Sequence, residues 1–148
     1  MKLQKKADSM TQHDDIILAE YSLEKSDKAL LAAEMISEKE YQTTLNRSYY
    51  AVFYIVLALG YLDGFKTGKH AQLMGWFNKK YIYQQKIFMP KYSEIYSQLM
   101  INRDKFDYDV SSIADYTNAI ESLESAKIFI ETVKPYVLNR IKQVKKES

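Results

Sequence analysis

The fold is decided by one stretch, residues 45–62, which reads LNRSYYAVFYIVLALGYL. Its apolar residues recur at spacings of four and three, beginning with Leu45, Tyr49 and Val52, and this is the period of an α-helix. The opposite side also carries aromatic or small residues, so the predicted helix is apolar nearly all round. Such a helix is covered on several sides by its neighbours. We therefore predict a core helix in the middle of an all-α bundle.

This stretch is too short to cross a membrane. Its uninterrupted apolar run extends from Tyr49 to Leu62, whereas a bilayer requires about 18–20 residues. The run also contains tyrosines, whose hydroxyl groups need hydrogen-bond partners. Residues 1–13 are polar and contain no apolar segment of the kind that directs secretion. We expect a cytoplasmic protein with no membrane partner.

The composition favours one helical domain. The chain has 148 residues, of which 47% are hydrophobic, with four glycines, two prolines and no cysteine. This length can bury one core, and the scarcity of chain-breaking residues favours long helices over strands. The net charge of +2 gives no strong overall attraction to nucleic acid. Basic residues gather near both ends, and we interpret them as solvated tails: Lys2, Lys5, Lys6, Arg140, Lys142, Lys145 and Lys146.

Working outward from the core helix, the pattern predicts a single domain over residues 1–148. We expect a loose leader over 1–11, a first helix over 14–37 and a core helix that ends at the glycines of 60–64. A shorter helix over 70–81 and a fourth over 91–106 follow. The capping-box form of residues 112–115 predicts the start of a fifth helix, which Pro135 should kink or end. The predicted core spans about residues 14–133, with basic flexible ends.

Arg103 is the most informative polar residue. It interrupts the apolar stripe of the fourth predicted helix, where a guanidinium is partly desolvated and must find partners. Asp107, four residues later, could supply a carboxylate. Two interpretations stay open: an arginine that faces an anion such as a phosphate in a groove, or an Arg103–Asp107 clamp at the end of the helix. The pattern alone favours the clamp.

Other candidate residues give weaker signals. Arg47 begins the core helix one turn before Tyr50, and His70 borders the apolar face of the third helix. Structural roles are favoured for both. The chain has only two histidines and no acidic ligand at a helpful spacing, so we expect no metal site. It also lacks a nucleophile elbow, a glycine-rich phosphate loop and a nucleotide-binding fingerprint, so we expect no cofactor.

Three segments together resemble the HEPN domain family. They read RSYYAVFY at 47–54, KTGKH at 66–70 and RDKFDY at 103–108, and a long final helix follows them. The chain is similar to the branch with an Arg-x-Tyr-Tyr-Ala-x-Phe-Tyr helix and a late Arg-x-x-x-Asp-Tyr element. The resemblance implies an up-and-down bundle of four to five helices that pairs as a homodimer. Family members include metal-independent ribonucleases, partners of nucleotidyltransferases in toxin–antitoxin pairs, and modules that bind RNA or nucleotides.

This sequence departs from the catalytic pattern of the family. Arg103 matches the motif arginine, but Asp107, Tyr108 and their neighbours stand where a histidine would follow. Imidazole exchanges protons near neutral pH, whereas an unperturbed Asp or Tyr does so poorly. We carry three hypotheses. The first is a module that binds a nucleotidyltransferase, RNA or a nucleotide. The second is an endoribonuclease in which Asp107, Tyr108 or His70 replaces the histidine, and the third is a purely structural dimerisation domain. The candidate catalytic residues are Arg103, Asp107 and Tyr108, and the candidate binding residues are Arg47, Tyr50 and His70.

Overall fold

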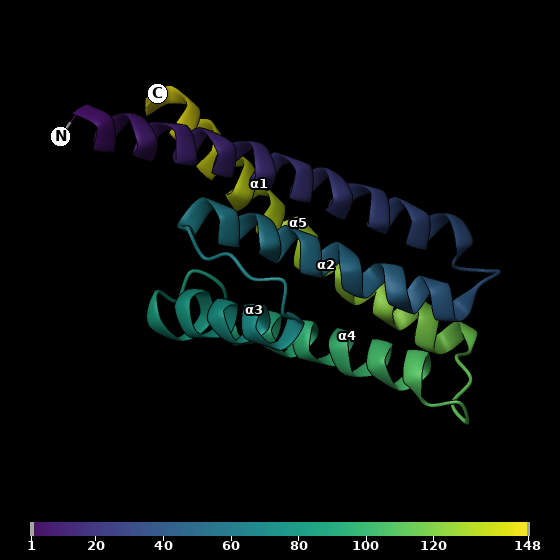
Figure 1. Ribbon diagram of the computed structural model, residues 1–148. Helices are drawn as coiled ribbons and strands as arrows, with labels where there is room; N and C mark the ends of the chain where they lie inside the picture. The colour runs from purple at the N-terminus through teal and green to yellow at the C-terminus, as the bar shows by residue number, and fades with distance from the viewer. Residues whose placement is uncertain (1, 148) are drawn as a thin grey trace.

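The computed structural model describes the backbone of residues 2–147 and the side chains of residues 12–147. Within that part the chain is helical and contains no strand, which confirms the predicted all-α fold. The helices are α1 (Lys2–Ile36), α2 (Tyr41–Asp63), α3 (His70–Phe77), the short π-helix η1 (Asn78–Gln84), α4 (Pro90–Tyr108) and α5 (Tyr116–Glu147). Figure 1 shows that α1, α2, α4 and α5 run alternately up and down, whereas α3 runs in the same direction as α2.

Helix α2 is the centre of the bundle, as its sequence predicts. It packs against α1, α3, α4 and α5, and Figure 1 shows it between α1 and the layer formed by α3 and α4. Tyr49, Val52, Val56 and Leu59 are all fully buried. The helix ends where expected, because Gly64 adopts the left-handed conformation and its N–H bonds back to the last turn.

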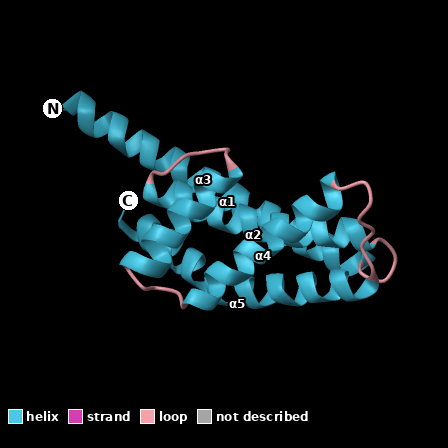
Figure 2. Ribbon diagram, turned by 90° about the horizontal axis from the view of Figure 1, so that it is seen from below, coloured by secondary structure: helices cyan, strands magenta, loops and turns pink. Residues whose placement is uncertain are grey.

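The first helix begins earlier than predicted. Residues 2–11 continue α1 toward the N-terminus, so the expectation of a loose leader there is wrong for the backbone. This extension projects beyond the other helices in Figure 2. Met1 lies outside the described residues, as do the side chains of Lys2, Lys5 and Lys6.

The start of α5 is capped by a different residue from the one predicted. Asp115 Oδ1 accepts a hydrogen bond from the Asn118 N–H, and Asn118 Oδ1 accepts one from the Asp115 N–H. This reciprocal pair satisfies two backbone donors at the helix start. Ser112 instead donates its hydroxyl proton to Asp109 in the preceding loop.

Pro135 does not end the last helix, which continues to Glu147 with Pro135 inside it. Two buried residues beyond it, Val137 and Ile141, extend the core past the predicted limit. Arg140 is not a solvated tail residue, since its Nη2 lies 2.7 Å from the carboxylate of Asp63 at the end of α2. These contacts hold the segment after the proline against the bundle.

Asp63 accepts several of the polar contacts at this end of the bundle. Its side chain is only 5% exposed, and it accepts hydrogen bonds from the Tyr81 hydroxyl and the Arg140 guanidinium, with the Lys80 ammonium 3.0 Å away. Burial alone would raise the pKa of this carboxyl, but the three donors outweigh it and lower the pKa. Asp63 therefore ties α2, η1 and α5 together at one end of the bundle.

Candidate functional site

Tyr49 on α2 is the point where the candidate residues of three helices meet. Its side chain is fully buried. The guanidinium carbon of Arg103, on α4, lies 4.6 Å from the centroid of its ring. His70, at the start of α3, places Nδ1 2.7 Å from the Tyr49 hydroxyl oxygen. One buried tyrosine thus links the arginine and the histidine.

Arg103 is buried, with 7% of its surface exposed, and its charge is compensated locally. Nη2 lies 2.7 Å from the carboxylate of Asp104, and Nη1 donates to the Tyr50 hydroxyl at 3.2 Å. Nε has no partner among the described residues. The predicted Arg103–Asp107 ion pair is wrong within this part of the chain, because the arginine turns to its immediate neighbour instead.

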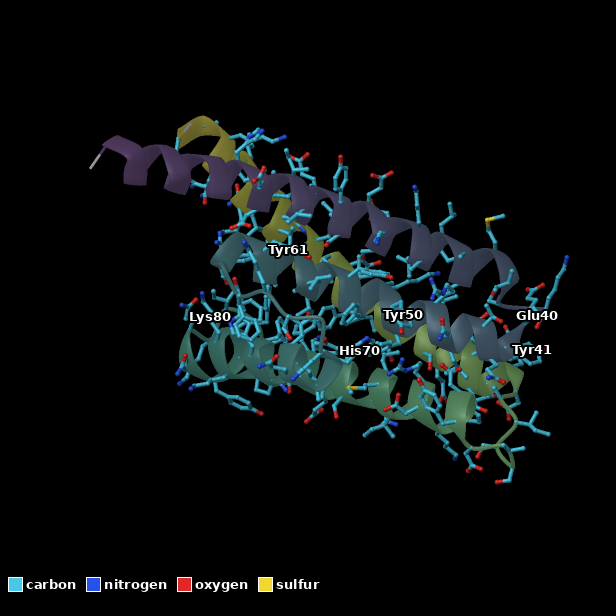
Figure 3. The ribbon with its side chains drawn as sticks, viewed as in Figure 1. Glu40, Tyr41, Tyr50, Tyr61, His70 and Lys80 are labelled. Atoms are coloured by element: carbon cyan, nitrogen blue, oxygen red, sulfur yellow. The ribbon has the colours of Figure 1, made fainter. Side chains whose placement is uncertain are left out.

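His70 lies in an aromatic environment beside the arginine. Its ring stacks on Phe53 with a centroid distance of 4.3 Å and meets Tyr50 edge-on at 5.7 Å. Tyr50 and His70 are labelled in Figure 3, between the ribbons of α2 and α4. Burial lowers the pKa of His70, the positive charge of Arg103 lowers it further, and Asp104 opposes these effects. The neutral form of the imidazole is therefore favoured.

Asp107 belongs to a second set of polar contacts, with the start of α2. It accepts hydrogen bonds from Asn46 at 3.0 Å and Gln42 at 3.4 Å. Asn46 in turn accepts two hydrogen bonds from Arg47, at 3.1 and 2.8 Å. The Arg47 guanidinium carbon lies 5.0 Å from the centroid of Tyr50. Two guanidinium groups therefore lie near the same tyrosine ring, since Arg103 is 5.6 Å from it.

Tyr108 forms the outer edge of this site. Its ring centroid lies 5.9 Å from the Arg103 guanidinium, but 73% of its surface is exposed. The loop that follows exposes further apolar side chains, namely Val110 and Ile113. Tyr108 is thus available to stack on a ligand or to contact another protein.

The structure joins all six predicted site residues in one continuous set of contacts. Sequence reasoning missed Tyr49, Asp104 and Asn46, which connect them. Tyr49 carried a signal, because its motif pairs it with Tyr50, but its core spacing made packing the obvious interpretation. Within residues 12–147 no group of three or more acidic, histidine or cysteine side chains is arranged to hold a metal ion. None of the helices in the described range has the length and apolarity of a membrane span.

The helical bundle and its arginine–tyrosine site belong to a chain that matches a known protein family. The sequence model of the HEPN domain matches residues 19–136, so the chain belongs to the HEPN domain family. It is also 27% identical over 119 residues to the protein named "Putative toxin MJ0142" from Methanocaldococcus jannaschii, and the alignment covers 80% of each chain. All six candidate residues fall inside the range that the family model matches.

Proposed function

We propose that this protein is a homodimeric HEPN module that binds the phosphate groups of RNA or a nucleotide at the Arg47–Tyr50–Arg103 site. The observation that carries the proposal is the pair of guanidinium groups on one half-buried tyrosine. Arginine is the residue best suited to phosphate because its planar donors match two oxygens. Tyrosine faces also stack on bases of single-stranded RNA.

The local charges support an anionic ligand. Asp104 pairs with Arg103, whereas Arg47 bonds only to the neutral amide of Asn46 and forms no ion pair with any described carboxylate. A phosphate near Arg47 would therefore meet an uncompensated positive charge. The exposed ring of Tyr108 lies 5.9 Å from the Arg103 guanidinium, so it is available to stack on a base attached to a phosphate at Arg103.

A binding assay tests this proposal. A fluorescent single-stranded RNA is titrated with wild-type protein and with Arg47→Gln and Arg103→Gln variants of equal folded content. Each variant should bind about tenfold more weakly or worse, because a charge-assisted hydrogen bond contributes about 1.5–3 kcal/mol. The plot of log affinity against log salt should also become shallower, by about 0.7 in slope for each phosphate that the variant no longer neutralises.

Lys79 supplies the matched control, because it is an exposed cation on η1. Lys79→Gln should leave RNA affinity nearly unchanged. If the wild type does not bind RNA, or if Lys79→Gln weakens binding as much as the arginine variants, the site does not recognise phosphate.

The position of His70 favours a second candidate function, metal-independent RNA cleavage. His70 is outside the family's usual motif but lies beside Arg103 through Tyr49. End-labelled RNA incubated in chelator would reveal cleavage by the wild type and none by Arg103→Gln. Intact RNA in both reactions would exclude cleavage of that substrate and leave the binding function.

The relative's name supports a toxin–antitoxin-like role. Expression in a bacterial host should slow growth, and Arg103→Gln should relieve the effect if the site is responsible. A small nucleotidyltransferase encoded next to this gene, which restores growth when co-expressed, would identify the partner. Growth that is unaffected by the wild type would argue against toxicity in that host.

The exposed loop beside the site supports the homodimer. Tyr108, Val110 and Ile113 present apolar surface to solvent next to Arg103, and such surface is typical of protein contacts. Light scattering should give a dimer mass for the wild type and a monomer mass for Val110→Asp/Ile113→Asp. The control is Leu31→Asp, on an exposed part of α1, which should remain dimeric.

A further inference from the structure

The two ring nitrogens of His70 have different surroundings. Nδ1 lies 2.7 Å from the hydroxyl oxygen of the buried Tyr49. Nε2 has no hydrogen-bond partner among residues 12–147, and the His70 side chain is half-buried, not fully enclosed. The histidine therefore has one nitrogen committed to the protein and one available to a ligand.

The direction of the Tyr49–His70 hydrogen bond follows from the number of protons that the phenol and the imidazole carry. Tyr49 is fully buried, and the His70 nitrogen is its only hydrogen-bond partner among the described residues. If Nδ1 carried a proton and donated it, the phenol proton would have no acceptor. The nearby Tyr96 hydroxyl does not accept it, because that oxygen is itself buried without a partner.

The phenol is protonated, because burial raises the pKa of Tyr49 far above its usual value and Arg103 only partly offsets this. The O–H group of Tyr49 therefore donates, and Nδ1 accepts with its lone pair. A neutral imidazole carries one proton. That proton is then on Nε2.

The charged groups around His70 maintain this neutral form. Arg103 from α4 repels a second proton on the imidazole, and Asp104 on the same helix opposes it. From α2 the ring meets only the uncharged side chains of Tyr49, Tyr50 and Phe53. An imidazolium would also leave the Tyr49 proton without an acceptor.

We propose that Tyr49 holds His70 as the Nε2–H tautomer, so that His70 donates a hydrogen bond to a phosphate oxygen of the ligand at Arg103. The identity of the ligand in this inference rests on the proposed function, whereas the assignment of the tautomer does not. The lone pair that a general base needs is already occupied by Tyr49. His70 is then a binding residue and Tyr49 is a positioning residue. In this tautomer His70 has no free lone pair with which to act as the general base of a cleavage reaction.

The tautomer can be read in the free protein by nitrogen NMR of labelled histidine. The chain has only His13 and His70, so His13→Ala assigns both sets of signals. At pH 8 the wild type should show an unprotonated Nδ1 and a protonated Nε2 for His70. Tyr49→Phe should move the Nδ1 signal and raise the pKa of His70, because this variant lacks the bond that favours the neutral ring.

Tyr96→Phe is the matched control. It removes a hydroxyl that has no partner among the described residues, from a ring whose centroid is 6.5 Å from that of Tyr49. It should leave the His70 signals unchanged. A proton on Nδ1 in the wild type would overturn the inference. The same holds if His70 gives the same signals in the wild type and in Tyr49→Phe.

RNA affinity tests the donor role separately. His70→Gln retains an N–H donor and should bind RNA within about twofold of the wild type, while His70→Ala should bind about tenfold more weakly. Equal affinities for wild type and His70→Ala would overturn the donor role. If the wild type binds no RNA, the proposed function fails, and the NMR result still decides the tautomer.

Discussion

The guanidinium of Arg103 lies over the ring of Tyr49, with 4.6 Å between the guanidinium carbon and the ring centroid. A desolvated cation over an aromatic face contributes about 0.5–2 kcal/mol, and the Asp104 ion pair and the Tyr50 hydrogen bond add to this. Arg103 therefore stabilises the packing of α4 on α2 as well as facing the site. Arg103 can therefore both clamp the helix and face an anion. Its ion-pair partner in the clamp is Asp104, not Asp107.

Replacing Arg103 should measurably destabilise the fold. Arg103→Ala should lower the free energy of unfolding by about 1–3 kcal/mol in urea titrations, because the variant lacks the ion pair, the hydrogen bond and the stacking on Tyr49. Asp104→Asn should cost less than Arg103→Ala, since it removes the ion pair but retains the Tyr50 hydrogen bond and the stacking on Tyr49. Equal costs for both variants would show that the ring contacts contribute nothing.

Asp63 should make stability depend on pH in the acid range. Its pKa is lowered in the folded state, so its contribution is fully present above the unfolded value of about 3.9 and is lost as pH falls through the folded value. At pH 7, Asp63→Asn should cost about 3 kcal/mol, because Arg140 and Lys80 lose their buried partner. The difference between wild type and variant should shrink below about pH 4. A difference independent of pH would contradict this.

The periodic pattern was sufficient to predict the fold. The all-round apolar character of residues 45–62 placed α2 at the centre, and the glycine pair marked its end. Arg103 was found because a guanidinium on an apolar stripe must have partners nearby. Its actual partner could not be predicted, because Asp104 and Asp107 are both within reach along a helix and only packing against Tyr49 and Tyr50 selects one.

The contact of His70 with Tyr49 also could not be predicted from the sequence. It depends on how the connection over residues 64–69 returns α3 along α2, and no local rule specifies that path. The prediction for Pro135 failed although a local rule did apply to it. The local preference to break a helix is real, but burial of Val137 and Ile141 and the Arg140–Asp63 pair outweigh it.

Gly60 should not tolerate a side chain. A Cβ atom there would lie 2.6 Å from the backbone oxygen of Phe65, which cannot move aside easily. Gly60→Ala should destabilise the protein by about 1–3 kcal/mol. Gly75→Ala is the matched control, because a Cβ there meets nothing within 4 Å and alanine is the better helix former. Thermal melts should show opposite shifts, and a neutral Gly60→Ala would contradict the steric argument.

Two buried tyrosine hydroxyls should respond differently to removal. The Tyr92 hydroxyl bonds to Thr132 at 2.7 Å, whereas the Tyr96 hydroxyl has no partner among the described residues. Tyr92→Phe should cost about 0.5–1.5 kcal/mol. Tyr96→Phe should be neutral or stabilising, because it removes an unsatisfied polar atom. Denaturant midpoints of the two variants provide the comparison, and a larger loss for Tyr96→Phe would contradict it.

The Asp63–Arg140 pair has a consequence for the order of folding during synthesis. Its residues are 77 positions apart, whereas α1 and α2 are neighbours in sequence and pack against each other directly. A nascent chain can therefore form the α1–α2 hairpin while the rest is still being translated. The Asp63–Arg140 ion pair cannot form until residue 140 leaves the ribosome, so we expect the segment beyond Pro135 to dock last and to complete the bundle in a single late step.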